Sequence, residues 1–116
     1  MCIRDRLKEV RDQFGHKITT EVATTKHVEE CLAINIDAVW IGARTTVNPF
    51  YVQELANALK GTNTPIYIKN PISADFGLWV GAIERFKKAG INNIQAIHRG
   101  FFSHTKSVYR LSLIHI

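Results

Sequence analysis

Residues 39–46 read Val-Trp-Ile-Gly-Ala-Arg-Thr-Thr, an apolar run that ends abruptly in a cation and two hydroxyls. The first five of these residues have the β-branched and aromatic bias of a short buried strand. Asn48 and Pro49 follow, and this pair is typical of a helix N-cap and a first helical position. A strand that is apolar up to Arg44 places that cation at the carboxyl edge of a sheet, where ligands bind in α/β folds.

The same alternation of strand and helix continues on both sides of this segment. We expect strands at residues 18–23, 38–44, 65–70 and 94–99, and helices at residues 6–14 and 26–34, from Pro49 to Gly61, and from Ser73 or Asp75 to Gly90. This order predicts an α/β fold with a parallel sheet and right-handed crossovers. About four βα units amount to a partial (β/α)₈ TIM barrel, since a complete one needs about 250 residues. On periodicity alone, an open doubly wound sheet fits equally well.

Each expected helix carries an apolar stripe at helical spacing. The stripes are Leu7, Val10 and Phe14; Val28, Cys31 and Leu32; Val52, Leu55, Ala56 and Leu59; and Trp79, Ala82, Ile83 and Phe86. We therefore expect these side chains to form the core between the helices and the sheet.

Composition restricts the class of protein. At 116 residues and 46% hydrophobic content, the chain allows one domain with a core of its own. The net charge is +5, but the cations are scattered, which favours a solvated surface over a nucleic-acid interface. No apolar run is long enough to span a membrane and no signal peptide is recognisable, so we expect a soluble, cytoplasmic protein without a membrane partner. Two cysteines do not make a disulfide framework.

The two ends of the sequence fit this pattern poorly. Residues 1–6 begin before the first expected helix, and residues 111–116 form an apolar run that follows Arg110 without turn residues. We interpret both as non-native tails around a domain at residues 7–110.

One ionisable residue closes each expected strand: Glu21, Arg44, Lys69 and Arg99. In a parallel sheet all four ends lie at one edge, so three cations and a carboxylate would converge there. Arginine suits phosphate or carboxylate because its planar fork donates two parallel hydrogen bonds, while lysine supplies a compact charge. The sequence thus predicts a site for a small polyanion. Thr45 and Thr46 could add hydroxyl or backbone donors to it, although threonine after a strand more often serves the turn itself. The alternative is that charged strand ends simply meet water.

Other chemistry-bearing residues give weaker signals. His27 and Cys31 have the i, i+4 spacing that two metal ligands could share, but no further ligand clusters with them, so core and surface roles are favoured. His98 alternates with Arg99 along the last strand and is expected to face the opposite side as a packed residue.

These residues also resemble a known family. Thr20-Glu21-Val22, residues 41–46 (Ile-Gly-Ala-Arg-Thr-Thr), Ile68-Lys69-Asn70 and His98-Arg99-Gly100, in this order and spacing, resemble the middle of 3-deoxy-7-phosphoheptulonate (DAHP) synthase. The resemblance runs from about Leu7 to Arg110, and the flanking segments 23–29 and 77–79 look most like the subgroup fused to chorismate mutase. It implies strands three to six of a (β/α)₈ barrel. The implied enzyme condenses phosphoenolpyruvate with erythrose 4-phosphate in the shikimate pathway of aromatic amino acid biosynthesis.

The resemblance also implies roles at the matching positions. Arg44, aided by the backbone N–H of Ala43, would grip the phosphate of phosphoenolpyruvate, and Arg99 would be its second phosphate-binding arginine. Lys69 would reach the carboxylate and the bridging region and is the candidate catalytic proton donor. Glu21 would act near the phosphate, through water or by holding the cations in place. The implied parent enzyme is a homo-oligomer that takes phosphorylated small molecules.

The sequence lacks the family's metal ligands and the residues that bind its second substrate. The family uses a divalent metal ion, but its ligands and the residues that bind erythrose phosphate lie on strands with no counterpart here. Two alternatives stay open: a 3-deoxy-8-phosphooctulonate synthase-like enzyme, whose corresponding motifs differ, and a non-catalytic half-barrel that binds a phosphorylated metabolite.

We predict that the 116-residue chain by itself binds no catalytic metal and forms no DAHP, because the implied metal ligands and second-substrate residues are missing. Incubation of the purified chain with phosphoenolpyruvate, erythrose 4-phosphate and divalent cations tests this. Detection of DAHP would contradict it.

Overall fold

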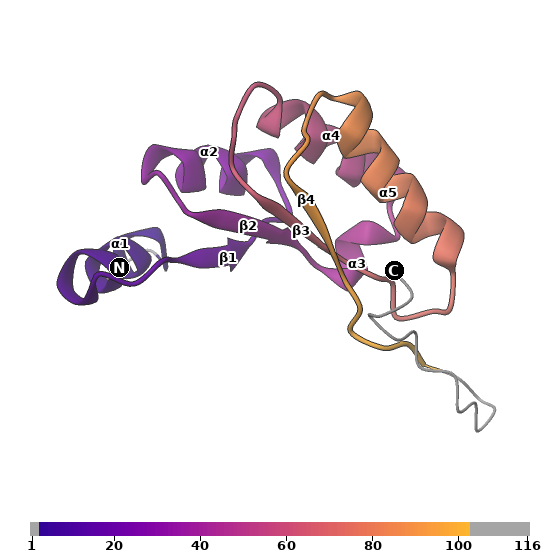
Figure 1. The fold of residues 1–116 in the computed structure, drawn as a ribbon, viewed down its shortest axis with the longest axis horizontal. Helices are drawn as coiled ribbons and strands as arrows, with labels where there is room; N and C mark the ends of the chain where they lie inside the picture. The colour runs from indigo at the N-terminus through magenta and orange to yellow at the C-terminus, as the bar shows by residue number, and fades with distance from the viewer. Residues whose placement is uncertain (1–2, 103–116) are drawn as a thin grey trace.

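The fold is a four-stranded parallel sheet with its helices between the strands, in a computed structural model that describes residues 3–102 (Figure 1). The elements are α1 (Ile3–Phe14), β1 (Thr19–Glu21), α2 (Thr25–Ala33), β2 (Ala38–Ile41), α3 (Ala43–Thr46), α4 (Pro49–Leu59), β3 (Ile66–Lys69), α5 (Phe76–Lys88) and β4 (Ile94–Ile97). The strands lie in the order β1-β2-β3-β4, so β1 and β4 form the two edges. The predicted α/β alternation is confirmed.

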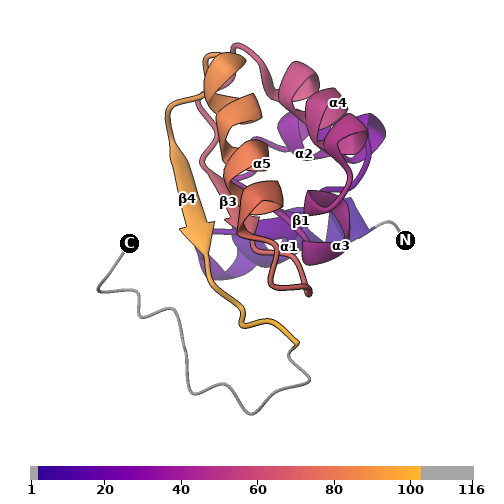
Figure 2. The same ribbon diagram turned by 90° about the vertical axis from the view of Figure 1, so that its right-hand side faces the viewer.

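The helices α2, α4 and α5 all lie on one face of the sheet, as the two views of the ribbon show (Figures 1 and 2). Neighbouring strands are also consecutive in the sequence. A doubly wound sheet would have helices on both faces, whereas a barrel segment has them on one. The arrangement of the described residues is therefore that of a partial (β/α)₈ barrel, and the doubly wound alternative is wrong.

The core lies between this face of the sheet and the three helices. In β2 and β3, Val39, Ile41, Ile66 and Ile68 are fully buried. The residues between them, Trp40 and Tyr67, are half-buried because they point to the other face, which carries no helix. The predicted stripes of α4 and α5 are buried against the strands, with Ile83 only partly covered. Asn48, Thr24 and Asp75 cap the helices α4, α2 and α5 through their side chains.

The strands are shorter than the sequence pattern predicts. Strand β2 ends at Ile41, because the backbone N–H groups of Thr45 and Thr46 both donate to the carbonyl of Gly42 and wind the next residues into α3. Strand β4 ends at Ile97, two residues before Arg99. None of the helices in the described part of the chain is long and apolar enough to cross a membrane.

Helix α1 differs most from its predicted form. It begins at Ile3, so residues 3–6 of the expected tail are helical, while residues 111–116 of the other expected tail lie outside the described residues. No residue of α1 is fully buried, and Val10 and Phe14 of its stripe are 42% and 65% exposed. The reason is its position beyond the edge strand β1, where only Leu7 reaches the core.

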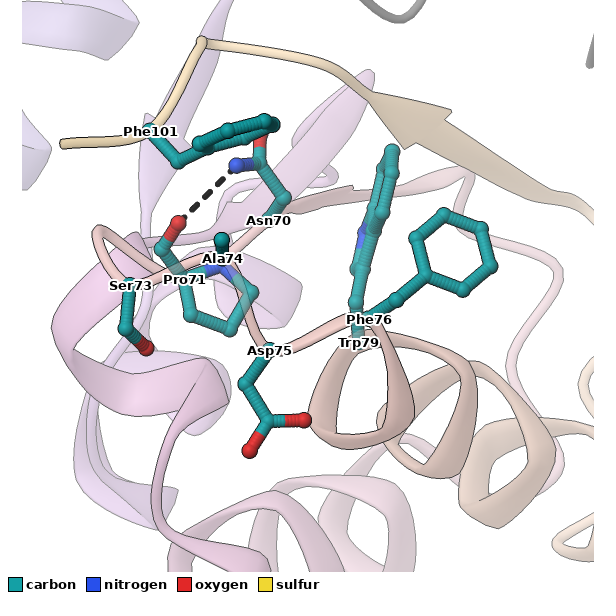
Figure 3. Close-up of a pocket in the computed structure, with 8 residues that line it drawn as sticks. All are labelled: Asn70, Pro71, Ser73, Ala74, Asp75, Phe76, Trp79 and Phe101. Atoms are coloured by element: carbon teal, nitrogen blue, oxygen red, sulfur yellow. Dashed lines mark hydrogen bonds between the residues drawn. The ribbon is translucent and has the colours of Figure 1, made fainter. Parts of the chain in front are cut away.

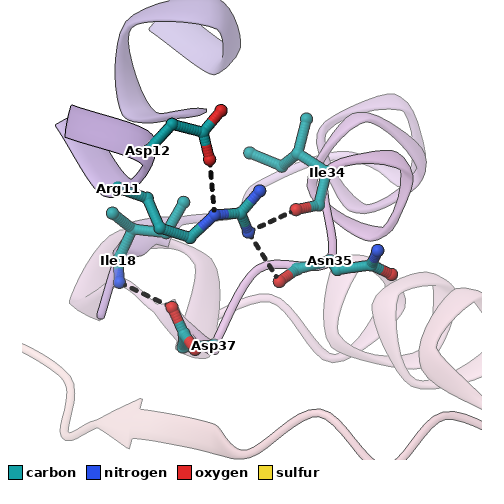
Figure 4. Close-up of polar contacts among 6 residues, drawn as sticks. All are labelled: Arg11, Asp12, Ile18, Ile34, Asn35 and Asp37. Carbon is teal, nitrogen blue, oxygen red and sulfur yellow. Dashed lines mark hydrogen bonds and ion pairs between the residues drawn. The ribbon is translucent and has the colours of Figure 1, made fainter. Parts of the chain in front are cut away.

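Polar contacts hold α1 instead (Figure 4). The guanidinium of Arg11 donates to the carbonyls of Ile34 and Asn35 (3.0 Å for Asn35) at the end of α2. Helix α2 has no basic residue in its own last turn, so Arg11 supplies the cation that favours a helix C-terminus. Asp37 Oδ2 accepts the Ile18 N–H at 2.8 Å and fixes the start of β1 beside the same turn.

We predict that Arg11→Ala releases α1 from the sheet while the rest of the fold persists. Hydrogen bonds to charged groups contribute about 1.5–3 kcal/mol, and the partial exposure of this one places the expected loss at its lower end. Hydrogen exchange would show faster exchange in α1 and unchanged protection in β2 and β3. The matched control is Lys8→Ala, an exposed cation on the same helix. Unchanged exchange in α1 of the Arg11 variant would contradict the prediction.

Candidate functional site

A polar hollow of about 210 Å³ lies at the carboxyl edge of the sheet. Its lining residues are Glu21, Trp40, Gly42, Ala43, Arg44, Lys69, Ile72 and Arg99. The predicted convergence is therefore confirmed: the three cations and the carboxylate line one hollow, although they are far apart in the sequence. The residues come from β1, β2, β3 and α3, from the junction of β2 and α3, and from the segments that follow β3 and β4.

The four charged residues do not all end strands as predicted. Glu21 and Lys69 are the last residues of β1 and β3. Arg44 instead lies in α3, and Arg99 lies in the loop after β4. The early ends of β2 and β4 thus move the two arginines off the sheet and onto the connections that rim the hollow.

In the described part of the chain, the three cations of the hollow form no ion pair with its carboxylate, Glu21. Within residues 3–102, no ion pair within 4.0 Å joins Glu21 to Arg44, Lys69 or Arg99, and the Arg44 guanidinium makes no hydrogen bond. The Arg99 Nη1 makes one long contact, 3.4 Å, to the carbonyl of Gly100. Most guanidinium donors in the hollow are therefore open to an anionic ligand, which could accept several charge-assisted hydrogen bonds at once.

Trp40 is a member of the hollow that the sequence reasoning missed. The ammonium of Lys69 lies over its indole ring, 3.6 Å from the ring centroid. A cation at this distance is attracted by the negative face of the ring, which stabilises it by about 0.5–2 kcal/mol. The sequence did hold a signal, because Trp40 lies two residues before Gly42 and therefore shares its face of the sheet.

Gly42 is required by the close approach of Glu21. A β-carbon placed at Gly42 would overlap the Glu21 carboxylate, which lies directly against the glycine. The backbone of Gly42 is ordinary, with φ of −73°, so a larger residue would meet no backbone strain but would have to displace the Glu21 side chain. The glycine in the segment of residues 39–46 thereby lets the carboxylate lie beside the start of α3.

Two buried polar side chains tie the strand ends together under the hollow. The hydroxyl of Thr46, 1% exposed, lies 3.0 Å from the Gly42 carbonyl and 2.9 Å from the Lys69 carbonyl, joining the ends of β2 and β3. Asn70, 4% exposed, joins the end of β3 to the loop after β4 through Arg99 and Gly100. The Thr46 hydroxyl therefore faces inward, toward the two carbonyls, as the turn role predicts, and does not donate to a ligand in the hollow.

A second pocket of about 210 Å³ lies beside the hollow and has different chemistry (Figure 3). Aromatic rings of Phe76, Trp79 and Phe101 form much of its wall. None of the three cations lines it, and it shares no lining residue with the hollow. His98 packs nearby between Trp79 and Phe101, with ring centroids 6.4 and 6.0 Å away, so its predicted role as a packed residue is confirmed.

His27 and Cys31 have no third metal-ligating side chain beside them in the described part of the chain. His27 Nδ1 accepts the N–H of Ala23 at 3.3 Å, and Cys31 is buried as predicted for a core residue. Burial, with a contribution from the nearby Glu30 carboxylate, raises the pKa of the Cys31 thiol. Among residues 3–102, no group of three or more His, Cys, Asp or Glu side chains could hold a metal ion.

Comparisons with known proteins agree with this fold. The structure resembles a DAHP synthase from Thermotoga maritima with a TM-score of 0.73 and 20% identity, over 89% of this chain and 29% of that one. A truncated form of the synthase from the same organism gives a TM-score of 0.71 and 21% identity, over 89% of this chain and 37% of the other. The chain thus spans about a third of the length of these proteins. No curated protein matches it.

The sequence itself gives the family. The model of the DAHP synthetase I family matches residues 4–114, which is nearly all of the 116 residues. No comparison distinguishes the subgroup that is fused to chorismate mutase. The chain belongs to the DAHP synthetase I family.

Proposed function

We propose that this chain forms the phosphoenolpyruvate-binding part of a DAHP synthase. That enzyme condenses phosphoenolpyruvate with erythrose 4-phosphate in the first step of the shikimate pathway. The observation that supports the proposal best is the hollow at the carboxyl edge, where Arg44, Lys69 and Arg99 converge without ion pairs among the described residues.

The ligand must carry more than one negative charge to balance three cations. Phosphoenolpyruvate has a phosphate and a carboxylate on a three-carbon skeleton, and a hollow of about 210 Å³ is of a size for such a small molecule. Arg44 and Arg99 offer planar forks for the phosphate oxygens, with the N–H of Ala43 beside Arg44. Each charge-assisted hydrogen bond is worth about 1.5–3 kcal/mol.

Lys69 would have a different task from the arginines. Strand β3, which carries Lys69, lies between the strands that lead to Arg44 and Arg99. The flexible ammonium can move from the Trp40 ring to the carboxylate or the bridging oxygen of the ligand. From there it can donate a proton to the bridging oxygen as water adds to C2, the bond from C2 to that oxygen breaks and phosphate leaves. Holding both ends of phosphoenolpyruvate fixes its C3 for attack on the aldehyde of the second substrate.

Glu21 would hold the side chains of this cluster of cations in place. It is the one carboxylate among the eight residues that line the hollow, and its place against Gly42 puts it beside the start of α3. A carboxylate there reduces the mutual repulsion of the cations before the ligand binds. It acts on them directly or through water.

The divalent metal that the family uses does not fit the described residues, which contain no suitable group of ligands. No step proposed here passes through a metal. Because the chain spans about a third of its structural relatives, catalysis is proposed for the longer protein, with this part as its phosphoenolpyruvate site. Homo-oligomerisation, a fused chorismate mutase and a cytoplasmic location stay predictions.

We predict that the purified chain binds phosphoenolpyruvate and that Arg44→Ala and Arg99→Ala each weaken this binding at least tenfold. Each variant removes a charge-assisted contact of about 1.5–3 kcal/mol. Isothermal titration calorimetry at low salt measures the affinity, since added salt screens the attraction. The control is Arg6→Ala, which removes the same charge from an exposed position on α1. Equal loss in the Arg6 variant, or no binding by the unmodified chain, would disprove the proposed site.

We also predict that Gly42→Ala destabilises the fold by about 1 kcal/mol only while Glu21 is present. The new methyl group would displace the flexible end of Glu21 rather than the backbone, because the three nearest atoms all belong to that side chain. In a Glu21→Ala background the same substitution should cost almost nothing. Urea unfolding of the four proteins of this double-mutant cycle measures the coupling. An equal cost in both backgrounds would show that the glycine is needed for another reason.

A further inference from the structure

We propose that Asn70 is a positioning residue, which holds Arg99 at the anion hollow by fixing the backbone on both sides of it. This inference rests on the proposed function, since it assumes that Arg99 binds the anion. Asn70 does not line the hollow and so does not touch the ligand there.

The side chain of Asn70 contacts Arg99 and its neighbour directly. Its Oδ1 accepts the backbone N–H of Arg99 at 2.7 Å, and its Nδ2 donates to the carbonyl of Gly100 at 3.0 Å. The second N–H of the amide donates to the carbonyl of Pro71 at 2.9 Å (Figure 3). The amide oxygen and both amide N–H groups of Asn70 therefore have partners, and the residue is 4% exposed.

Arg99 needs such a restraint because the sheet does not hold it. Strand β4 ends at Ile97, and the last ladder-like bond at this edge runs from the Asn70 N–H to the Ile97 carbonyl at 3.1 Å. The chain then turns at Gly100, which has a positive φ of 85°. The next bond that holds this loop runs from the Phe102 N–H to the Ile72 carbonyl at 2.8 Å. Between these two bonds the Asn70 amide restrains Arg99, and without it the ordering of the Arg99 backbone on binding would cost more conformational entropy.

Asparagine is the residue that this contact requires. It offers one acceptor for the Arg99 N–H and two donors for the carbonyls, whereas ionised aspartate offers acceptors alone and leucine neither. Asn70 also follows Lys69 directly. Side chains alternate along a strand, so Lys69 faces the hollow while Asn70 is buried beneath the loop that carries Arg99. Lys69 is thus one of the three cations of the hollow, and the next residue, Asn70, holds a second one, Arg99.

The alternative is that Asn70 only stabilises the fold, and a double-mutant cycle separates the two roles. Phosphoenolpyruvate affinity is measured by calorimetry for Asn70→Ala, Arg99→Ala, Arg44→Ala and the two doubles that contain Asn70→Ala. We expect Asn70→Ala to weaken binding about tenfold. That loss should vanish in the Arg99→Ala background, because the residue acts through Arg99, and persist in the Arg44→Ala background.

The matched control is Thr46→Val, which removes another buried hydrogen-bonding side chain at the same edge, one with no hydrogen bond to Arg99. Any binding loss that it causes should be the same with and without Arg99. Asn70→Asp keeps the acceptor for the Arg99 N–H but sets a carboxylate oxygen against the carbonyls of Pro71 and Gly100, so it should restore none of the affinity lost in Asn70→Ala. An effect of Asn70→Ala that is equal in the Arg99 and Arg44 backgrounds would overturn the inference.

A measurement on the unmodified chain covers the case in which the variants do not fold. Amide exchange by NMR should show Arg99 protected although it lies outside β4, and exchange at the rate of an open loop would overturn the inference. The proposed function fails separately, if the unmodified chain binds no phosphoenolpyruvate or if both arginine variants bind it normally. If the arginines matter and Asn70 shows no selective coupling to Arg99, the positioning role alone is wrong.

Discussion

The carboxyl edge of this sheet depends on buried hydrogen bonds made by side chains, because the backbone ladder ends there. Thr46 joins the ends of β2 and β3, and Asn70 joins the end of β3 to the loop after β4. Among residues 3–102, the buried polar residues are Thr45, Thr46 and Asn70, and all three belong to this edge. An unpaired buried polar group costs about 1–3 kcal/mol, so each of these bonds restricts the loops to arrangements that preserve it.

This constraint separates the residues that hold the edge from those that face the ligand. The Thr46 hydroxyl and the Asn70 amide are buried and have partners within the protein, whereas Arg44 and Arg99 are exposed, and Lys69 is half-buried over Trp40. Because the backbone beneath the cations is already fixed, less conformational entropy is lost when a ligand binds. The same design explains Gly42, whose missing side chain leaves room for the Glu21 carboxylate beside those cations.

The one-sided packing of the helices accounts for the open character of the site. Helices α2, α4 and α5 cover one face of the sheet, and the core residues of β2 and β3 point toward them. Trp40, Tyr67 and Lys69 point to the other face and stay half-buried in the described part of the chain. Helix α1 lies past the edge strand β1 and has little core to contact, so a polar anchor through Arg11 takes the place of packing.

The sequence by itself predicted what depends on near neighbours in the chain. The apolar stripes of α4 and α5, the cap at Asn48 and the order of the strands follow from helical and strand periods and from capping chemistry, which act over a few residues. For α5 the same chemistry left Ser73 and Asp75 open as caps, and the structure has Asp75. The convergence of Glu21, Arg44, Lys69 and Arg99 was also predictable, because a parallel sheet brings all its strand ends to one edge. The tertiary structure alone decided the partners: the inward hydroxyl of Thr46, the Asn70 bond to Arg99, Lys69 over Trp40, and the exposure of the α1 stripe. The first three depend on how segments 23 or more residues apart are placed against each other, which no local pattern encodes. The exposure of the α1 stripe depends on the position of α1 beyond the edge strand β1, which is equally non-local.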